Sequence, residues 1–266
     1  MQGPIRFLLS AILIASTAAV TLCQTQPEIT SPSPDAGTPH PLSWWTQDAL
    51  RLDTDGMLHI GRGPGKVAAS HYAFRSTVST IGTLSGHKIL QVVTSIYPRN
   101  EVIASGWSNV GNPDNQWKTL LVRSGDSEEY VELYRVQSSS GEYILPLKPA
   151  AIYGSGPDAI LATNDPISGN GAGCTDGYWW FDEAGAHAID FSPLLKAVNR
   201  AVPRNTVYTS NCWAMDPAKL ELRAPIQRAD AQCHACGWIG EVRARYKIEH
   251  GTALPVSVHF TPEEGQ

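Results

Sequence analysis

Residues 238–249 have the sequence WIGEVRARYKIE, and this stretch decides the fold class. Its even-numbered positions carry W, G, V, A, Y and I, whereas the odd-numbered positions after Ile239 carry E, R, R, K and E. Side chains of a β-strand point alternately to its two faces, so this pattern predicts a strand that is buried on one side only. The even-numbered side chains are expected to point into the core.

The alternation continues on both sides of this stretch. Leu220 and Leu222 alternate with charged residues before it, and Val256, Val258 and Phe260 alternate with polar residues after it. We therefore expect a meander of three antiparallel strands over 218–261, with all five of these apolar side chains facing inward.

The rest of the chain also consists mostly of strand-like runs. Strand-like runs separated by Gly, Ser, Asn and Pro clusters occur at 56–61, 88–97, 117–123, 130–136, 142–147 and 159–163. A hairpin is expected around Ser124-Gly125-Asp126, and one helix is expected to begin with Ser192 as its cap and Pro193 after it and to end before Pro203. The predicted fold class is mainly β, an antiparallel, sandwich-like domain with one or two short helices.

The N-terminus has the features of an export signal. Arg6 is followed by an uncharged run over 7–22, which is too short for a comfortable membrane span. We assign 1–23 to the signal, 24–41 to a disordered Pro/Ser/Thr-rich tether and 42–266 to a β-rich globular region. The protein is therefore expected outside the cytoplasm, whether secreted, periplasmic or at the outer surface; an uncleaved signal anchor is the alternative.

Cys23 is a candidate lipidation site. The sequence Val20-Thr21-Leu22-Cys23 resembles a bacterial lipobox, although Leu22 stands where that pattern has Gly, Ala or Ser. Ordinary signal cleavage fits the same region, so lipidation and plain secretion both stay open.

The remaining four cysteines are Cys174, Cys212, Cys233 and Cys236. A thiol-redox centre at Cys233-x-x-Cys236 would need a helix to lower the thiol pKa, and a strand is predicted after it. A zinc site would need two further ligands. Because an oxidising compartment favours disulfides, we prefer the pairs Cys174–Cys212 and Cys233–Cys236, with redox and metal binding as alternatives.

Two groups of residues are candidates for chemistry. Asp182, Glu183 and His187 lie beside the aromatic run at 178–181, and carboxylates next to aromatic side chains resemble sugar-cleaving sites. Asp182 and Glu183 also suit a hairpin turn. The glycine-rich loop at 165–177 contains Asp165, Asn170 and Asp176, whose oxygens are candidate ligands for Ca²⁺. The preferred interpretation of this loop is a long turn fixed by a disulfide at Cys174. We assign no metal and no cofactor.

The leading hypothesis for function is a non-enzymatic binding or envelope-associated protein with an unknown envelope or extracellular ligand. An exported hydrolase acting on glycans or peptidoglycan is the alternative, and a thiol-redox or metal-binding protein is a further one. The formal charge of −5 gives no broad basic surface for nucleic acid. Membrane contact is expected only through an N-terminal lipid or the signal anchor.

Overall fold

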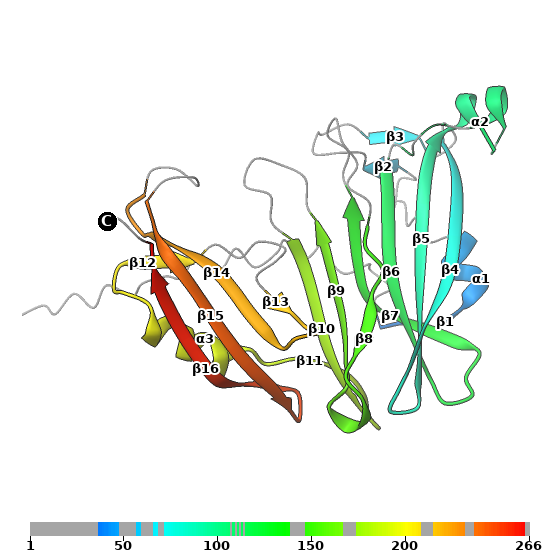
Figure 1. The fold of residues 1–266 in the computed structure, drawn as a ribbon. Coiled ribbons are helices and arrows are strands. Elements are labelled where there is room, and N and C mark those ends of the chain that lie inside the picture. Colours follow the sequence, from blue (N-terminus) through cyan, green and yellow to red (C-terminus); the bar gives the residue numbers. More distant parts are fainter. Residues whose placement is uncertain are drawn as a thin grey trace, which may run out of the picture.

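The structure is a computed structural model that describes residues 37–47, 57–59, 66–68, 72–106, 108–109, 111, 113, 115–138, 147–166, 174–208, 215–231 and 237–263. The described residues form a mainly β protein with antiparallel sheets and three short α-helices, where one or two were expected. The predicted fold class is confirmed. Three sheets stand side by side as layers, and we call them the first, middle and third sheets in chain order (Figure 1). Among the described residues, no helix has the length and apolar character needed to span a bilayer.

The first sheet has the strand order β1 (His40–Pro41), β7 (Glu129–Ser138), β6 (Asn115–Ser124), β5 (His87–Pro98) and β4 (Tyr72–Leu84). Helix α1 (Leu42–Gln47) covers its outer face, where Trp45 is fully buried against Leu90 and Leu121. The strands predicted at 88–97, 117–123 and 130–136 are confirmed, and so is the hairpin between the last two. Helix α2 (Arg99–Ser105) follows β5.

A separate two-stranded sheet consists of β2 (Met57–His59) and β3 (Lys66–Ala68). The strand predicted at 56–61 is confirmed at Met57–His59, and the other residues of that range lie outside the described residues. Of the strand predicted at 142–147, all but the last residue lies outside the described residues, and Leu147 itself is not in a strand.

The middle sheet has the order β11 (Gly185–Ala188), β10 (Cys174–Asp182), β9 (Ile160–Pro166) and β8 (Ala151–Tyr153), with a short 3₁₀ helix, η2 (Gly156–Asp158), before β9. It is covered on both faces. Leu161 joins a core cluster with Leu120 of the first sheet, whereas the adjacent Ile160 joins the cluster of the third sheet. Burial on both faces explains why the sequence at 159–163 is apolar without alternation.

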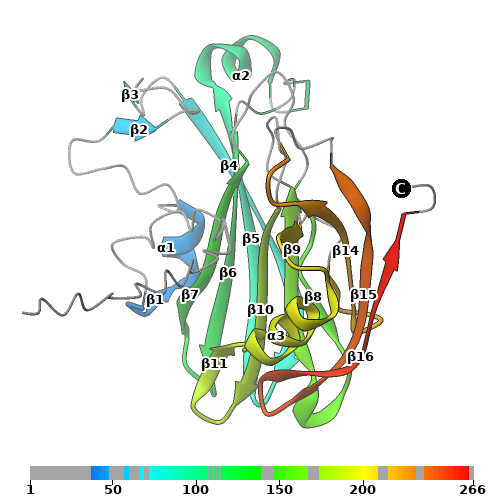
Figure 2. The same ribbon diagram turned by 90° about the vertical axis from the view of Figure 1, so that its left-hand side faces the viewer.

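The third sheet has the order β12 (Thr206–Tyr208), β14 (Glu221–Arg228), β15 (Trp238–Glu249) and β16 (Thr252–Pro262), and β13 (Met215–Asp216) pairs with β14. Helix α3 (Ser192–Ala201) packs against β15 and β16 through Leu194 and Val198 (Figure 2). The meander is as predicted, since the even-numbered side chains from Val242 to Ile248 are buried.

Two local predictions in the third layer are wrong. Val256 is 62% exposed, because a bulge pairs Arg245 with Ser257 and Tyr246 with Pro255, which leaves Val256 as the extra residue. Ser192 does not cap α3; Phe191 occupies the N-cap position without a side-chain cap. Instead, the carboxylate of Asp190 accepts a hydrogen bond from the Ser192 backbone N–H at 2.8 Å.

Candidate functional site

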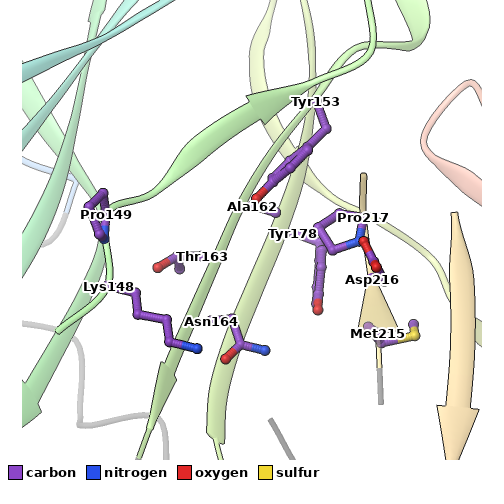
Figure 3. A pocket seen from close by; sticks show the side chains of 10 residues that line it. All are labelled: Lys148, Pro149, Tyr153, Ala162, Thr163, Asn164, Tyr178, Met215, Asp216 and Pro217. Carbon is purple, nitrogen blue, oxygen red and sulfur yellow. The ribbon is translucent and has the colours of Figure 1, made fainter. Parts of the chain in front are cut away.

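A cavity of about 230 Å³ lies between the middle sheet and the β13–β14 turn of the third sheet (Figure 3). Three parts of the chain form it: the segment that leads into β8, the paired strands β9 and β10, and β13 with the residue after it. The described lining residues are Lys148, Pro149, Tyr153, Ala162, Thr163, Asn164, Tyr178, Met215, Asp216 and Pro217. The cavity therefore combines two tyrosines with amide, hydroxyl, amine and carboxylate groups.

The register of the middle sheet places part of this lining. Tyr178 of β10 pairs directly with Ala162 of β9, so these two side chains lie on the same face. Asn164 lies two residues further along β9 and therefore also faces the third sheet. The period of the strand thus directs Ala162, Asn164 and Tyr178 to one side and leaves Leu161 for the core on the other.

Asp216 supplies a fixed carboxylate to the cavity wall. Its Oδ1 accepts hydrogen bonds from the backbone N–H groups of Ala218 at 3.1 Å and Lys219 at 3.2 Å, and its Oδ2 lies 2.8 Å from the Lys219 ammonium. The hydrogen bond from Lys219 is the main reason that the pKa of the Asp216 carboxyl is lowered. The group is therefore an ionised acceptor with its position set by the turn.

A fully buried ion pair lies behind the wall of this cavity. Lys118 of β6 and Asp165 of β9 have no exposed side-chain surface, and they join the first sheet to the middle sheet. The Lys118 ammonium also donates to the hydroxyl of Thr163 and to the backbone carbonyl oxygen of Lys148, the latter at 2.8 Å. All three ammonium N–H groups therefore have acceptors, and two of these belong to residues that line the cavity.

Burial is the largest influence on the pKa of Lys118. Desolvation lowers the pKa of its ammonium, although the carboxylate of Asp165 acts in the opposite direction. Asp165 Oδ2 also accepts a hydrogen bond from Thr163 Oγ1 at 2.9 Å, and Tyr134 Oη lies 3.5 Å away. Asp165 Oδ1 is buried and receives no hydrogen bond from the described residues. Such a network positions the cavity wall and depends on both charges being present.

The residues suspected of catalysis lie elsewhere, on the β10–β11 hairpin. Asp182 Oδ1 accepts from the backbone N–H groups of Ala184 at 2.8 Å and Gly185 at 3.1 Å, and from His187 Nε2 at 2.9 Å. The hydrogen bond from His187 is the main cause of the lowered pKa of Asp182. Glu183 is exposed at the turn. Asp182 therefore acts as a turn acceptor and, with His187, forms a surface pair.

The candidate ligand loop is only partly described. Asp165 is held by Lys118, Asn170 lies outside the described residues, and Asp176 pairs through its backbone with Asn164. Within the described ranges, no group of three or more His, Cys, Asp or Glu residues has an arrangement that could hold a metal ion. The proposed ligand set of the loop stays a prediction.

The cysteine predictions fall on residues whose side chains the structure does not describe. Cys23, Cys212, Cys233 and Cys236 lie outside the described residues, and only the backbone of Cys174, at the start of β10, is described. The disulfide pairing and the lipidation therefore stay predictions.

Sequence reasoning missed Lys118, Tyr153 and Asp216. Lys118 could have been found from the sequence. It lies two residues before Leu120 in an apolar strand, so both side chains point to the same buried face, and a charge at such a position needs a buried partner. No sequence pattern identifies Tyr153 or Asp216, because each lies in a strand of two or three residues that becomes part of a site only through packing.

A second hollow, of about 580 Å³, lies at the end of the third sheet beside Arg204 and Arg228. The side chains of Arg228 and its partner Asp230 are 61% and 79% exposed, so their contact is screened by solvent and weakly fixed. The smaller cavity between the sheets has its carboxylate anchored by backbone groups and its wall tied to a buried ion pair. It is the better candidate site.

Comparison with known protein families, with curated protein sequences and with solved structures finds no match to this chain. Function therefore has to be argued from the chemistry of the site.

Proposed function

We propose that this protein works outside the cytoplasm as a non-enzymatic binding protein, with the cavity between its middle and third sheets as the ligand site. The observation that carries this proposal is the cavity itself, in which aromatic rings and polar groups converge from three separate parts of the chain. A mostly preformed concave site with a few oriented polar groups is the usual form of a small-molecule site. The uncharged run at 7–22 and the Pro/Ser/Thr-rich segment at 24–41, which the sequence analysis interprets as an export signal and a tether, support the location.

The state of Asp216 supports binding rather than proton transfer. A general acid or base works best with a pKa near the working pH, whereas two backbone N–H groups and Lys219 favour the ionised form of this carboxyl. Asp216 is thus suited to accept a hydrogen bond from a ligand without exchanging its own proton.

An exported hydrolase acting on glycans or peptidoglycan is the second candidate. The observation that favours it is the 2.9 Å contact between Asp182 and His187, which is accessible because their side chains are 39% and 46% exposed. A redox or metal role for Cys233 and Cys236 lies outside the described residues and is kept as the third candidate.

A fragment library screened by ligand-observed NMR against the exported, full-length protein tests the binding proposal. Ala162→Leu places a larger side chain in the cavity, and Ala188→Leu makes the same change at an exposed site on the same sheet. We expect a set of fragments whose binding is lost in the first variant and kept in the second. If every bound fragment binds both variants equally, the cavity is not the ligand site.

A further inference from the structure

We propose that the cavity binds a neutral, polyhydroxylated ligand, and specifically a single sugar ring at the end of a glycan. This inference rests on the binding function proposed above and adds the chemical class of the ligand. It follows from the charges, the hydrogen-bonding groups, the apolar surfaces and the size of the cavity.

The charges at the cavity disfavour ligands of either sign. In the view of Figure 3, the side chains of Lys148 and Asp216 approach from opposite sides of the cavity. Lys219 adds a second cation next to Asp216. An anionic ligand would lie close to the Asp216 carboxylate, and a cationic one would lie close to the Lys148 side chain. A neutral ligand meets neither repulsion, and its desolvation on entry is less costly than that of an ion.

The hydrogen-bonding capacity of Asp216 fits a hydroxyl group. A carboxylate offers about four acceptor positions, and the two backbone N–H groups together with the Lys219 ammonium occupy three of them. The remaining position accepts one further donor from the cavity. The side chains of Asn164, Tyr153 and Tyr178 each carry both a donor and an acceptor group, which is the property that matches a ring bearing several hydroxyl groups.

The apolar part of the lining fits the carbon face of a sugar. The rings of Tyr153 and Tyr178 border the cavity, and Pro149, Met215 and Pro217 complete the apolar surface. Tyrosine provides an apolar ring with a polar tip, so that one residue contacts both the C–H groups and the hydroxyl groups of a sugar. Neither a fully apolar ligand nor a compact ion uses both kinds of surface.

The size of the cavity sets the length of the ligand. A volume of about 230 Å³ is below the range of roughly 300–1,000 Å³ that is typical of sites for drug-sized molecules. One pyranose ring fits such a space, whereas a second ring would extend outside it. We therefore expect recognition of a terminal residue, with the remainder of the glycan in solvent.

A series of sugars that share one ring and differ in charge tests this inference. The probes are glucose and N-acetylglucosamine as neutral sugars, glucosamine at a pH where its amine is protonated, and glucuronate. Binding to the full-length protein is measured by ligand-observed NMR at millimolar concentration, with Ala162→Leu to show which binding occurs in the cavity. We expect at least one neutral sugar to bind there at least ten-fold more tightly than both charged ones.

A variant pair tests the role of Asp216. Asp216→Asn removes the fixed charge, so discrimination against glucuronate should fall several-fold; Asp190→Asn changes another carboxylate that accepts a backbone N–H, outside the cavity, and should leave it unchanged. Tighter cavity binding of a charged sugar, or no cavity binding by either neutral sugar, overturns the inference. If other fragments still bind in a manner sensitive to Ala162→Leu, the proposed function stands; if none do, both proposals fail.

Discussion

The ammonium of Lys118 and the carboxylate of Asp165 form an ion pair that is completely enclosed between the first and middle sheets. Removing one partner of such a pair leaves an uncompensated buried charge, which typically destabilises a protein by about 3–5 kcal/mol. We expect Lys118→Met to lower the free energy of unfolding by this amount, as measured by urea denaturation. The variant should also bind cavity ligands more weakly, because the Lys148 carbonyl oxygen and the Thr163 hydroxyl lose their common donor.

The double variant Lys118→Met with Asp165→Leu is the control. It removes both charges and leaves apolar side chains of similar size, which is often neutral for stability. Most of the lost free energy of unfolding should therefore return. Equal destabilisation of the single and double variants would show that packing, and not the unpaired charge, is responsible.

The alternation in β15 and the exposure of Val256 show what the sequence can and cannot predict. The buried face of β15 follows from its own side chains, since each even-numbered residue is apolar and each odd-numbered one from Glu241 on is charged. The side chain of Val256 is apolar as well, but its direction depends on a bulge that exists only in the pairing of β16 with β15. Register is a property of two strands, and a pattern in one of them does not contain it.

The candidate site was harder to predict than the fold for a related reason. The sequence pointed to Asp182, Glu183 and His187, which lie close together in the chain and form a hairpin turn. The cavity instead joins Lys148, Asn164 and Asp216, which come together only when the third sheet packs on the middle one.

The strand β4 was not predicted, because Ser and Thr interrupt the apolar positions of its sequence.

Two substitutions in the third sheet test the bulge. Ile248 is 5% exposed in the core, so Ile248→Ala should lower the free energy of unfolding by about 2–5 kcal/mol. Val256 is 62% exposed, so Val256→Ala should change it by no more than about 0.5 kcal/mol. Chemical denaturation of the two variants measures both values. A large loss at Val256 would mean that this side chain faces the core and that the bulge is misplaced.

The pair of Asp182 and His187 should contribute to stability in acid. Because the folded state lowers the pKa of Asp182, the contribution is fully present above the ordinary carboxyl pKa and is lost as the pH falls through the folded value. Asp182→Asn should therefore reduce Tm at neutral pH and show a smaller further loss in acid than the parent protein. Glu183→Gln, at the exposed tip of the same turn, is the control and should follow the parent.

The same Asp182→Asn variant separates the binding protein from the hydrolase. If the pair only shapes the hairpin, the variant changes Tm and leaves the binding of cavity ligands intact. Release of reducing ends from peptidoglycan or glycans by the parent protein, and its loss in the variant, would favour the enzyme over the binding function.

Tyr246 should limit stability in alkali. Its hydroxyl is buried in the third sheet without a hydrogen-bond partner among the described residues, and burial, aided by the Asp216 carboxylate, raises its pKa. Above a pH of about 10 the unfolded chain releases this proton while the folded protein keeps it. The folded state then binds more protons, so the free energy of unfolding falls as the pH rises, by up to about 1.4 kcal/mol per pH unit.

Tyr246→Phe removes the buried hydroxyl that lacks a partner among the described residues, and with it the ionisation that lowers stability in alkali. The variant should be more stable than the parent at neutral pH by about 1 kcal/mol, because a buried hydroxyl without a partner costs about 1–3 kcal/mol and the ring remains. Its alkaline loss of stability should also be less steep, as measured by urea denaturation at several pH values. Tyr97→Phe, at a half-buried position in β5, controls for the loss of one phenol. A Tyr246→Phe variant that is less stable than the parent would show that the hydroxyl has a partner.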